Sequence, residues 1–96
     1  MGRSGAGAAA RPEIRVRLTI VHRQDCELCD LMVADLTALG RREALPPLEL
    51  VDVDADPVLQ RRHGLNVPVL LLDGTVVCRQ RLDIPELLRI LRAPLA

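Results

Sequence analysis

The sequence predicts an α/β domain with the element order β-α-β-α-β-β-α, built on a four-stranded mixed sheet with helices on both faces. Two observations lead to this class. Stretches in which apolar residues alternate with polar ones are interleaved with stretches in which apolar residues recur at helical spacing. In addition, Asp73-Gly74 separates two apolar runs, which is typical of a β-hairpin. The leading strand–helix–strand unit implies a parallel pair of strands, and the hairpin adds an antiparallel pair.

The first half of the chain contains a strand, a helix and a second strand. In "EIRVRLTIV", which begins at Glu13, apolar residues alternate with arginine and threonine, and this pattern predicts a strand with one apolar face. Over residues 27–39, leucine and methionine recur at helical spacing, and Gly40 is suited to end that helix. The second strand starts after Pro47, at Leu48, because proline cannot occupy the interior of a central strand.

The second half contains a short helix, the hairpin and a closing helix. Asp56 can cap a helix that has proline in its first turn, and Gly64 is suited to end it. After the hairpin, Asp83 is followed three residues later by Glu86, which is the arrangement of a capping box. Leucine and isoleucine then continue at helical spacing until near Pro94. We therefore expect three helices and four strands in one domain.

Length and composition indicate how the chain is organised and which partners it has. The 96 residues fit one domain, which we assign to residues 13–94, with residues 1–12 as a flexible tail. The tail has two arginines and no acidic residue, so a role in organelle targeting stays open. No apolar run is long enough to cross a membrane, and we expect no membrane partner.

Charge and cysteine content indicate which partners and which cellular compartment to expect. Thirteen basic and thirteen acidic residues cancel, and aromatic residues are absent, so we expect no nucleic-acid partner. The three cysteines are an odd number, whereas secreted disulfide frameworks favour even numbers. We therefore expect a reducing compartment, the cytoplasm, where a close cysteine pair is more often catalytic or metal-binding than structural.

The stretch "DCELCD" holds two of the cysteines, at the junction between the first strand and the first helix. Cys26 then lies at the helix N-terminus and Cys29 one turn further in, which is close enough for a disulfide. The free N–H groups and partial positive charge of a helix N-terminus favour a thiolate, so Cys26 is the candidate nucleophile and Cys29 the more buried thiol. Arg23 can add to this stabilisation and Asp25 opposes it, and either effect can dominate.

Two other interpretations of the pair stay open. The cysteines can be two small apolar residues, although the polar neighbours of Cys26 argue against this. They can also belong to a zinc site, for which Cys78, His22 and His63 are isolated further candidates. No second C-x-x-C and no H-x-x-x-H accompany the pair, so we predict no metal site. We expect Cys78 to be a buried small residue and His63 to face the C-terminal dipole of its helix.

Three pieces of the chain resemble the glutaredoxin/thioredoxin superfamily, in particular its small glutaredoxin-like proteins with an unusual C-x-x-C. They are "CELC", "VDVDADPVLQRRHGLNVPVLLLDG" and "RLDIPELLRIL", and the resemblance spans residues 14–91. It implies a thioredoxin-like fold with a redox-active disulfide. It also implies that Pro68 is a cis proline that faces the cysteines, and that the backbone of Val67 pairs with a bound thiol peptide.

The same resemblance bears on glutathione. Members of the superfamily that bind glutathione resemble one another after the last strand, where they carry Gly-Gly and then an acidic residue. This chain has "CRQRLD" at that place. The resemblance implies that Asp83 caps the last helix and meets an amino group of the ligand. Arg79 and Arg81 stand where glycines are expected, and their charge can replace part of a carboxylate site.

The sequence therefore predicts a small monomeric thiol–disulfide oxidoreductase that reduces protein disulfides or glutathione mixed disulfides. No cofactor is bound, and glutathione is a candidate co-substrate. The alternative is a thioredoxin-fold binding module, or a metal-holding protein, that does not turn over. The residues predicted to form the site are the catalytic Cys26 and Cys29 and the substrate-binding Val67, Pro68, Arg23 and Asp83.

Overall fold

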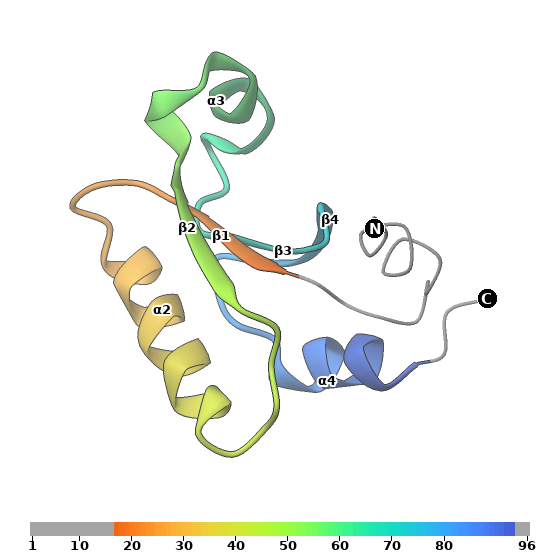
Figure 1. The fold of residues 1–96 in the computed structure, drawn as a ribbon. Helices are drawn as coiled ribbons and strands as arrows, with labels where there is room; N and C mark the ends of the chain where they lie inside the picture. The colour runs from red at the N-terminus through yellow and green to blue at the C-terminus, as the bar shows by residue number, and fades with distance from the viewer. Residues whose placement is uncertain (1–16, 94–96) are drawn as a thin grey trace, which may run out of the picture.

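The computed structural model describes residues 17–93 and contains one four-stranded mixed sheet (Figure 1). Its strands are β1 (Leu18–His22), β2 (Leu48–Asp52), β3 (Val69–Leu72) and β4 (Thr75–Arg79). They lie in the order β2-β1-β3-β4, with β1 parallel to β2 and antiparallel to β3, and with β4 antiparallel to β3. The predicted fold class and element order are confirmed. The expected tail at 1–12, the start of the first strand at 13–16 and the end near Pro94 lie outside the described residues.

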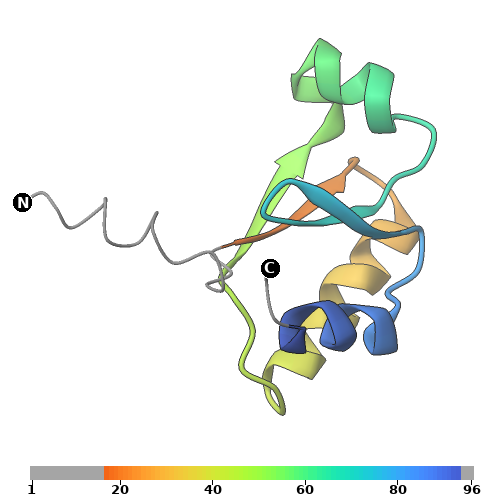
Figure 2. The ribbon, with the colours of Figure 1, turned by 90° about the vertical axis from the view of Figure 1, so that its right-hand side faces the viewer.

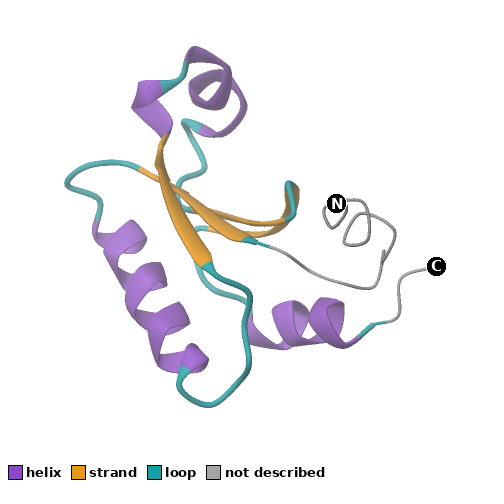
Figure 3. Ribbon diagram, in the orientation of Figure 1, coloured by secondary structure: helices purple, strands orange, loops and turns teal. Residues whose placement is uncertain are grey.

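Three helices and one short 3-10 turn connect and cover the strands, as Figure 3 shows by colour. They are α2 (Glu27–Gly40), η1 (Val53–Ala55), α3 (Pro57–His63) and α4 (Ile84–Arg92). Figures 1 and 2 show α2 and α4 on one side of the sheet and α3 beyond the end of β2. None of the helices between residues 17 and 93 combines the length and the apolar character that a membrane-spanning helix requires.

Both faces of the sheet carry apolar clusters, because successive side chains of a strand point to opposite faces. On one face Ile20 belongs to the main core, which α2 and α4 close with Met32, Leu36, Leu39 and Leu87. On the other face a smaller cluster of Val21, Val53 and Val69 packs against Leu59 of α3. The core is aliphatic, as a chain without aromatic residues requires, and no polar side chain of residues 17–93 is buried. Polar chemistry is therefore confined to the surface and to half-buried positions.

Local contacts fix the ends of three elements, and one of them differs from the sequence-based expectation. Gly40 is the last residue of α2 and Arg41 caps it, in agreement with the predicted helix end. The chain leaves β2 at Asp52, because the Asp52 carboxylate accepts a hydrogen bond from the backbone of Asp54 at 2.8 Å and starts η1. The capping box is only half made: Asp83 accepts from the Glu86 backbone N–H, whereas the Glu86 carboxylate pairs with Arg89, outside the box, at 2.8 Å.

A tight turn after β4 is a feature that the sequence did not indicate. Gln80 has a φ of 69°, a left-handed conformation that favours glycine. Its N–H donates to the carbonyl oxygen of Pro68 at 2.6 Å, and the next N–H, of Arg81, donates to the carbonyl oxygen of Arg79 at 2.7 Å. These two bonds hold the exposed Gln80 in a conformation that is unfavourable for a side chain with a Cβ.

We expect Gln80→Gly to raise the free energy of unfolding by about 0.5–1 kcal/mol. Relief of the left-handed conformation gains roughly 1–2 kcal/mol, and the greater freedom of glycine in the unfolded chain offsets part of that gain. Urea unfolding of this variant beside Gln80→Ala, which keeps a Cβ, measures the difference. A glycine variant less stable than the alanine variant would contradict the conformational argument.

Candidate active site

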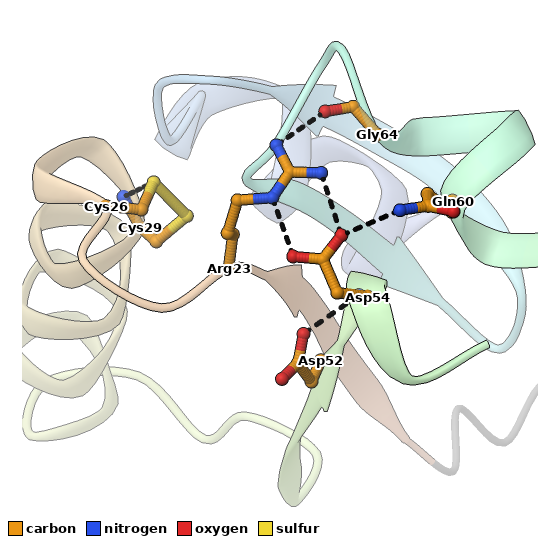
Figure 4. Close-up of polar contacts among 7 residues, drawn as sticks. All are labelled: Arg23, Cys26, Cys29, Asp52, Asp54, Gln60 and Gly64. Carbon is orange, nitrogen blue, oxygen red and sulfur yellow. Dashed lines mark hydrogen bonds and ion pairs between the residues drawn. A yellow bond between two sulfur atoms is a disulfide. The ribbon is translucent and has the colours of Figure 1, made fainter. Parts of the chain in front are cut away.

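The two cysteines lie where β1 gives way to α2. Cys26 is the N-cap of α2 in an extended conformation, and the preceding residue, Asp25, has a φ of 54° that turns the chain into the helix. The Cα atoms of Cys26 and Cys29 are 5.2 Å apart and their sulfur atoms form a disulfide. The backbone N–H of Cys29 donates to the sulfur of Cys26 at 3.1 Å (Figure 4). The pair is thus held at the helix N-terminus, as predicted.

The two sulfur-bearing residues differ in exposure. Cys29 is 1% exposed and belongs to the apolar interior, whereas Cys26 is only half-buried at the start of the helix. An incoming thiol or disulfide can reach Cys26 more readily than Cys29. The hydrogen bond from the Cys29 N–H and the helix dipole favour negative charge at that sulfur, while the acidic side chains of Glu27 and Asp30 in the first turn oppose it.

Arg23 precedes the cysteines by three residues, but its guanidinium binds elsewhere. Its Nε and Nη2 donate to the two carboxylate oxygens of Asp54 at 2.9 and 3.1 Å, and its Nη1 donates to the carbonyl oxygen of Gly64 at 2.9 Å. Figure 4 shows the guanidinium directed toward Asp54 and Gly64 and away from the disulfide. The Arg23 charge, which the sequence suggested as a thiolate partner, is paired with a carboxylate in this arrangement.

Asp54 is the centre of this polar cluster. Besides Arg23, it accepts a hydrogen bond from the side-chain amide of Gln60 on α3 at 3.0 Å, and its backbone N–H donates to Asp52. The hydrogen bonds from Arg23 and then Gln60 lower the pKa of the Asp54 carboxyl, and the bond to Asp54 raises the pKa of Arg23. Sequence analysis missed Asp54, because its partner lies 31 residues away and only the parallel pairing of β1 with β2 brings the two together.

Gly64 is required by close approach rather than by an unusual φ. A Cβ at this position would lie 2.5 Å from the carbonyl oxygen of Gln60 and 3.5 Å from the Nη2 of Arg23. The backbone N–H of Gly64 also donates to the Gln60 carbonyl at 2.9 Å and ends α3. The predicted helix end is confirmed, and the glycine is required there by its close approach to the Gln60 carbonyl.

Val67 and Pro68 lie at the start of β3, next to the end of β1. The peptide bond between them is cis, which confirms the conformation that the family resemblance implied. Val21 pairs with Val69 in the sheet, so Pro68 lies at the end of the sheet from which the cysteine loop leaves. Pro68 is buried and Val67 is half-buried. The contact of Val67 with a thiol peptide stays a prediction.

An open cleft of about 620 Å³ lies between the end of β4 and the start of α4. Cys78, Arg79, Arg81 and Asp83 are among the residues that line it. Asp83 caps α4, as predicted, by accepting from the Glu86 backbone at 3.0 Å. Cys78 is half-buried against the main core rather than fully buried, and burial raises the pKa of its thiol.

The residues that could have completed a zinc site do not gather around the cysteine pair. Across residues 17–93, no group of three His, Cys, Asp or Glu side chains could hold a metal ion. His63 lies at the end of α3, where its Nδ1 is buried and has no hydrogen-bond partner among the described residues. Burial first, and then the charges of Arg62 and Arg79, lower the pKa of His63.

Comparisons with known proteins agree with this geometry. A family model described as "Glutaredoxin-like domain (DUF836)" matches residues 17–92. The solution structure of protein Ne2328 from Nitrosomonas europaea is similar, with 26% identity and a TM-score of 0.71 over 80% of this chain and 92% of that chain. Protein XcR50 from X. campestris is 34% identical, with a TM-score of 0.58 over 80% of this chain and 99% of that chain. No curated protein matches the chain.

We expect protonation of His63 to destabilise the fold as the solution is acidified. The unfolded chain binds this proton near pH 6.5, and the folded chain binds it at a lower pH, so stability is lost as pH falls from about 6.5 through the folded pKa. His63→Gln should show a smaller loss of unfolding free energy between about pH 7 and 5 than the parent chain. Urea unfolding at each pH measures it, with His22→Gln as the control. If His63→Gln lost as much unfolding free energy between these pH values as the parent chain, the assignment of this loss to His63 would be wrong.

Proposed function

The chain belongs to the family of glutaredoxin-like domains, and from this premise we propose that it is a small thiol–disulfide oxidoreductase in which Cys26 attacks and Cys29 resolves. One observation carries the proposal. The two cysteines lie at the N-terminus of α2 with Cα atoms 5.2 Å apart, and Cys29 is buried whereas Cys26 is only half-buried. This asymmetry supports different roles for two residues of the same chemistry.

The reduction of a substrate disulfide would occur in two exchange steps. The Cys26 thiolate attacks one substrate sulfur, a Cys26–substrate disulfide forms, and the other substrate sulfur leaves as a thiolate that takes up a proton. Cys29 then loses its proton and attacks the Cys26 sulfur, which releases the second substrate thiol and closes the Cys26–Cys29 disulfide. Two electrons have passed from the pair to the substrate, and two molecules of an external thiol such as glutathione would return them.

Binding of the substrate would use the end of the sheet beside the cysteines. We assign the backbone of Val67 and the ring of Pro68 to the edge on which a thiol peptide docks. The cleft beside them would take the rest of a ligand, with Asp83 meeting an amino group and Arg79 or Arg81 meeting a carboxylate. Arg23 is bound to Asp54 and Gly64, so a direct contact with substrate would require it to leave those partners. We propose that this chemistry operates in a monomer in the cytoplasm.

The division of roles predicts different behaviour for the two cysteine-to-serine variants. Cys29→Ser should accumulate a mixed disulfide with a thiol substrate, because the resolving thiol is gone, whereas Cys26→Ser should accumulate none. Mass spectrometry of each variant after exposure to a disulfide substrate, with Cys78→Ser as the background in both, distinguishes them. Equal trapping by both variants would contradict the roles. A binding module would behave differently. The unsubstituted chain would reduce no disulfide, and both variants would hold a partner as well as the unsubstituted chain does.

We expect glutathione to bind weakly, so that protein disulfides are the better substrates. The N-terminus of α4 can receive a carboxylate, but Asp83 places a negative charge at that N-terminus and Arg81 occupies the cleft with a long side chain. These opposing effects are each on the order of 1 kcal/mol at exposed positions. Calorimetric titration of Cys29→Ser with glutathione disulfide measures the affinity. Tight, stoichiometric binding that is lost in Arg81→Ala would overturn this ranking of substrates.

A further inference from the structure

We propose that Asp54 is a positioning residue for the redox site: it holds the guanidinium of Arg23 away from Cys26 and so keeps the Cys26 thiolate without a cationic partner. The inference rests on the proposed function, because it concerns how reactive Cys26 is and how readily the Cys26–Cys29 disulfide opens. It concerns a residue that does not touch the sulfur atoms and acts through Arg23.

The contacts of Arg23 support this role. The guanidinium is bound on three sides, by both carboxylate oxygens of Asp54 and by the carbonyl oxygen of Gly64, at distances of 2.9 to 3.1 Å. Two parallel N–H···O bonds to one carboxylate fix the plane of the guanidinium as well as its position. Figure 4 shows the side chain running from the cysteine loop toward η1 and α3, with the disulfide on its other side. The side chain is therefore held in one orientation, away from the sulfurs.

Asp54 is itself held in place for this task. The Asp52 carboxylate fixes the backbone of Asp54 at 2.8 Å, and Gln60 donates to the same carboxylate oxygen that accepts from Arg23 Nη2. The carbonyl oxygen of Gly64 accepts from Arg23 Nη1 at 2.9 Å and holds the guanidinium from the other side. Elements from three parts of the chain thus converge on a single arginine side chain.

The charges around Cys26 make the position of Arg23 consequential. Between Leu18 and Gly40, Arg23 is the only arginine or lysine, and its near neighbours in sequence, Asp25, Glu27 and Asp30, are all acidic. While Asp54 neutralises Arg23, the helix N-terminus favours the thiolate without help from this arginine. If Asp54 lost its charge, an unpaired cation would lie three residues from Cys26, and the thiolate would become more favourable.

The effect on the redox equilibrium follows from that change. Opening of the disulfide consumes two glutathione thiols and yields the dithiol and one glutathione disulfide, so two electrons enter the pair. Anything that stabilises the Cys26 thiolate stabilises the reduced side of this exchange. Asp54 therefore shifts the equilibrium toward the disulfide and makes the reduced pair a stronger reductant.

The test is a double-mutant cycle in the full chain, in which Asp54→Asn, Arg23→Gln and the double variant are compared with the parent chain. We expect Asp54→Asn to raise the rate of Cys26 alkylation by iodoacetamide at about pH 6 roughly threefold, and the double variant to return it to the parent rate. The same roughly threefold shift toward the dithiol should appear in glutathione buffers of graded ratio.

Two control variants accompany the cycle. Asp54→Glu, which keeps the charge, should behave like the parent. Glu43→Gln is the matched control, because it frees Arg92 from an ion pair at the other end of α2 and should change neither value.

The outcomes separate this inference from the proposed function. An unchanged or slower alkylation rate in Asp54→Asn, or a double variant as fast as Asp54→Asn alone, would overturn the positioning role. If a substitution in this cluster merely damaged the fold, both single variants would change the alkylation rate in the same direction. A double variant that returns to the parent rate excludes that explanation. The alkylation rate of the pre-reduced protein reports on Arg23 even if the chain reduces no disulfide. Failure of the proposed function would leave this rate difference intact.

Discussion

The position of β1 between a parallel and an antiparallel neighbour is the constraint on which the candidate site depends. Pairing with β2 brings the ends of the two strands together, so that Arg23 and Asp54 emerge side by side. Pairing with β3 in the opposite direction brings the start of that strand, and with it Pro68, to the same end of the sheet. The cysteines follow β1 directly at the start of α2. Residues far apart in the sequence are therefore neighbours because of strand direction alone.

Local patterns in the sequence were sufficient to predict most of the fold. Alternation predicted the strands, Asp56 and Asp83 predicted two helix starts, and the Asp73-Gly74 pair predicted the hairpin. Each of these signals acts within a few residues, where backbone propensity and side-chain capping decide the conformation. The cysteine pair was placed correctly for the same reason, because its position depends only on the junction between one strand and one helix.

The remaining features depend on contacts over long sequence distances. The bond between Arg23 and Asp54 joins residues 31 positions apart, and no local pattern distinguishes that aspartate from its acidic neighbours. The left-handed Gln80 is held by the carbonyl of Pro68, across the pairing of β3 with β4. The Glu86 side chain does not make its predicted capping bond, because it forms an ion pair with Arg89, one turn along the helix. In each case the tertiary partner decided between local alternatives that the sequence left open.

The central claim is that Cys26 and Cys29 form one reversible redox pair and that Cys78 stands apart from it. The most direct measurement equilibrates the protein in glutathione buffers of graded thiol-to-disulfide ratio, quenches with an alkylating reagent and locates the labels by mass spectrometry. The account predicts a single transition in which Cys26 and Cys29 gain labels together, while Cys78, half-buried and outside the disulfide, remains a thiol at every ratio. A pair that no ratio opens or closes, or a transition that exchanges Cys78 with one of the two, would contradict it.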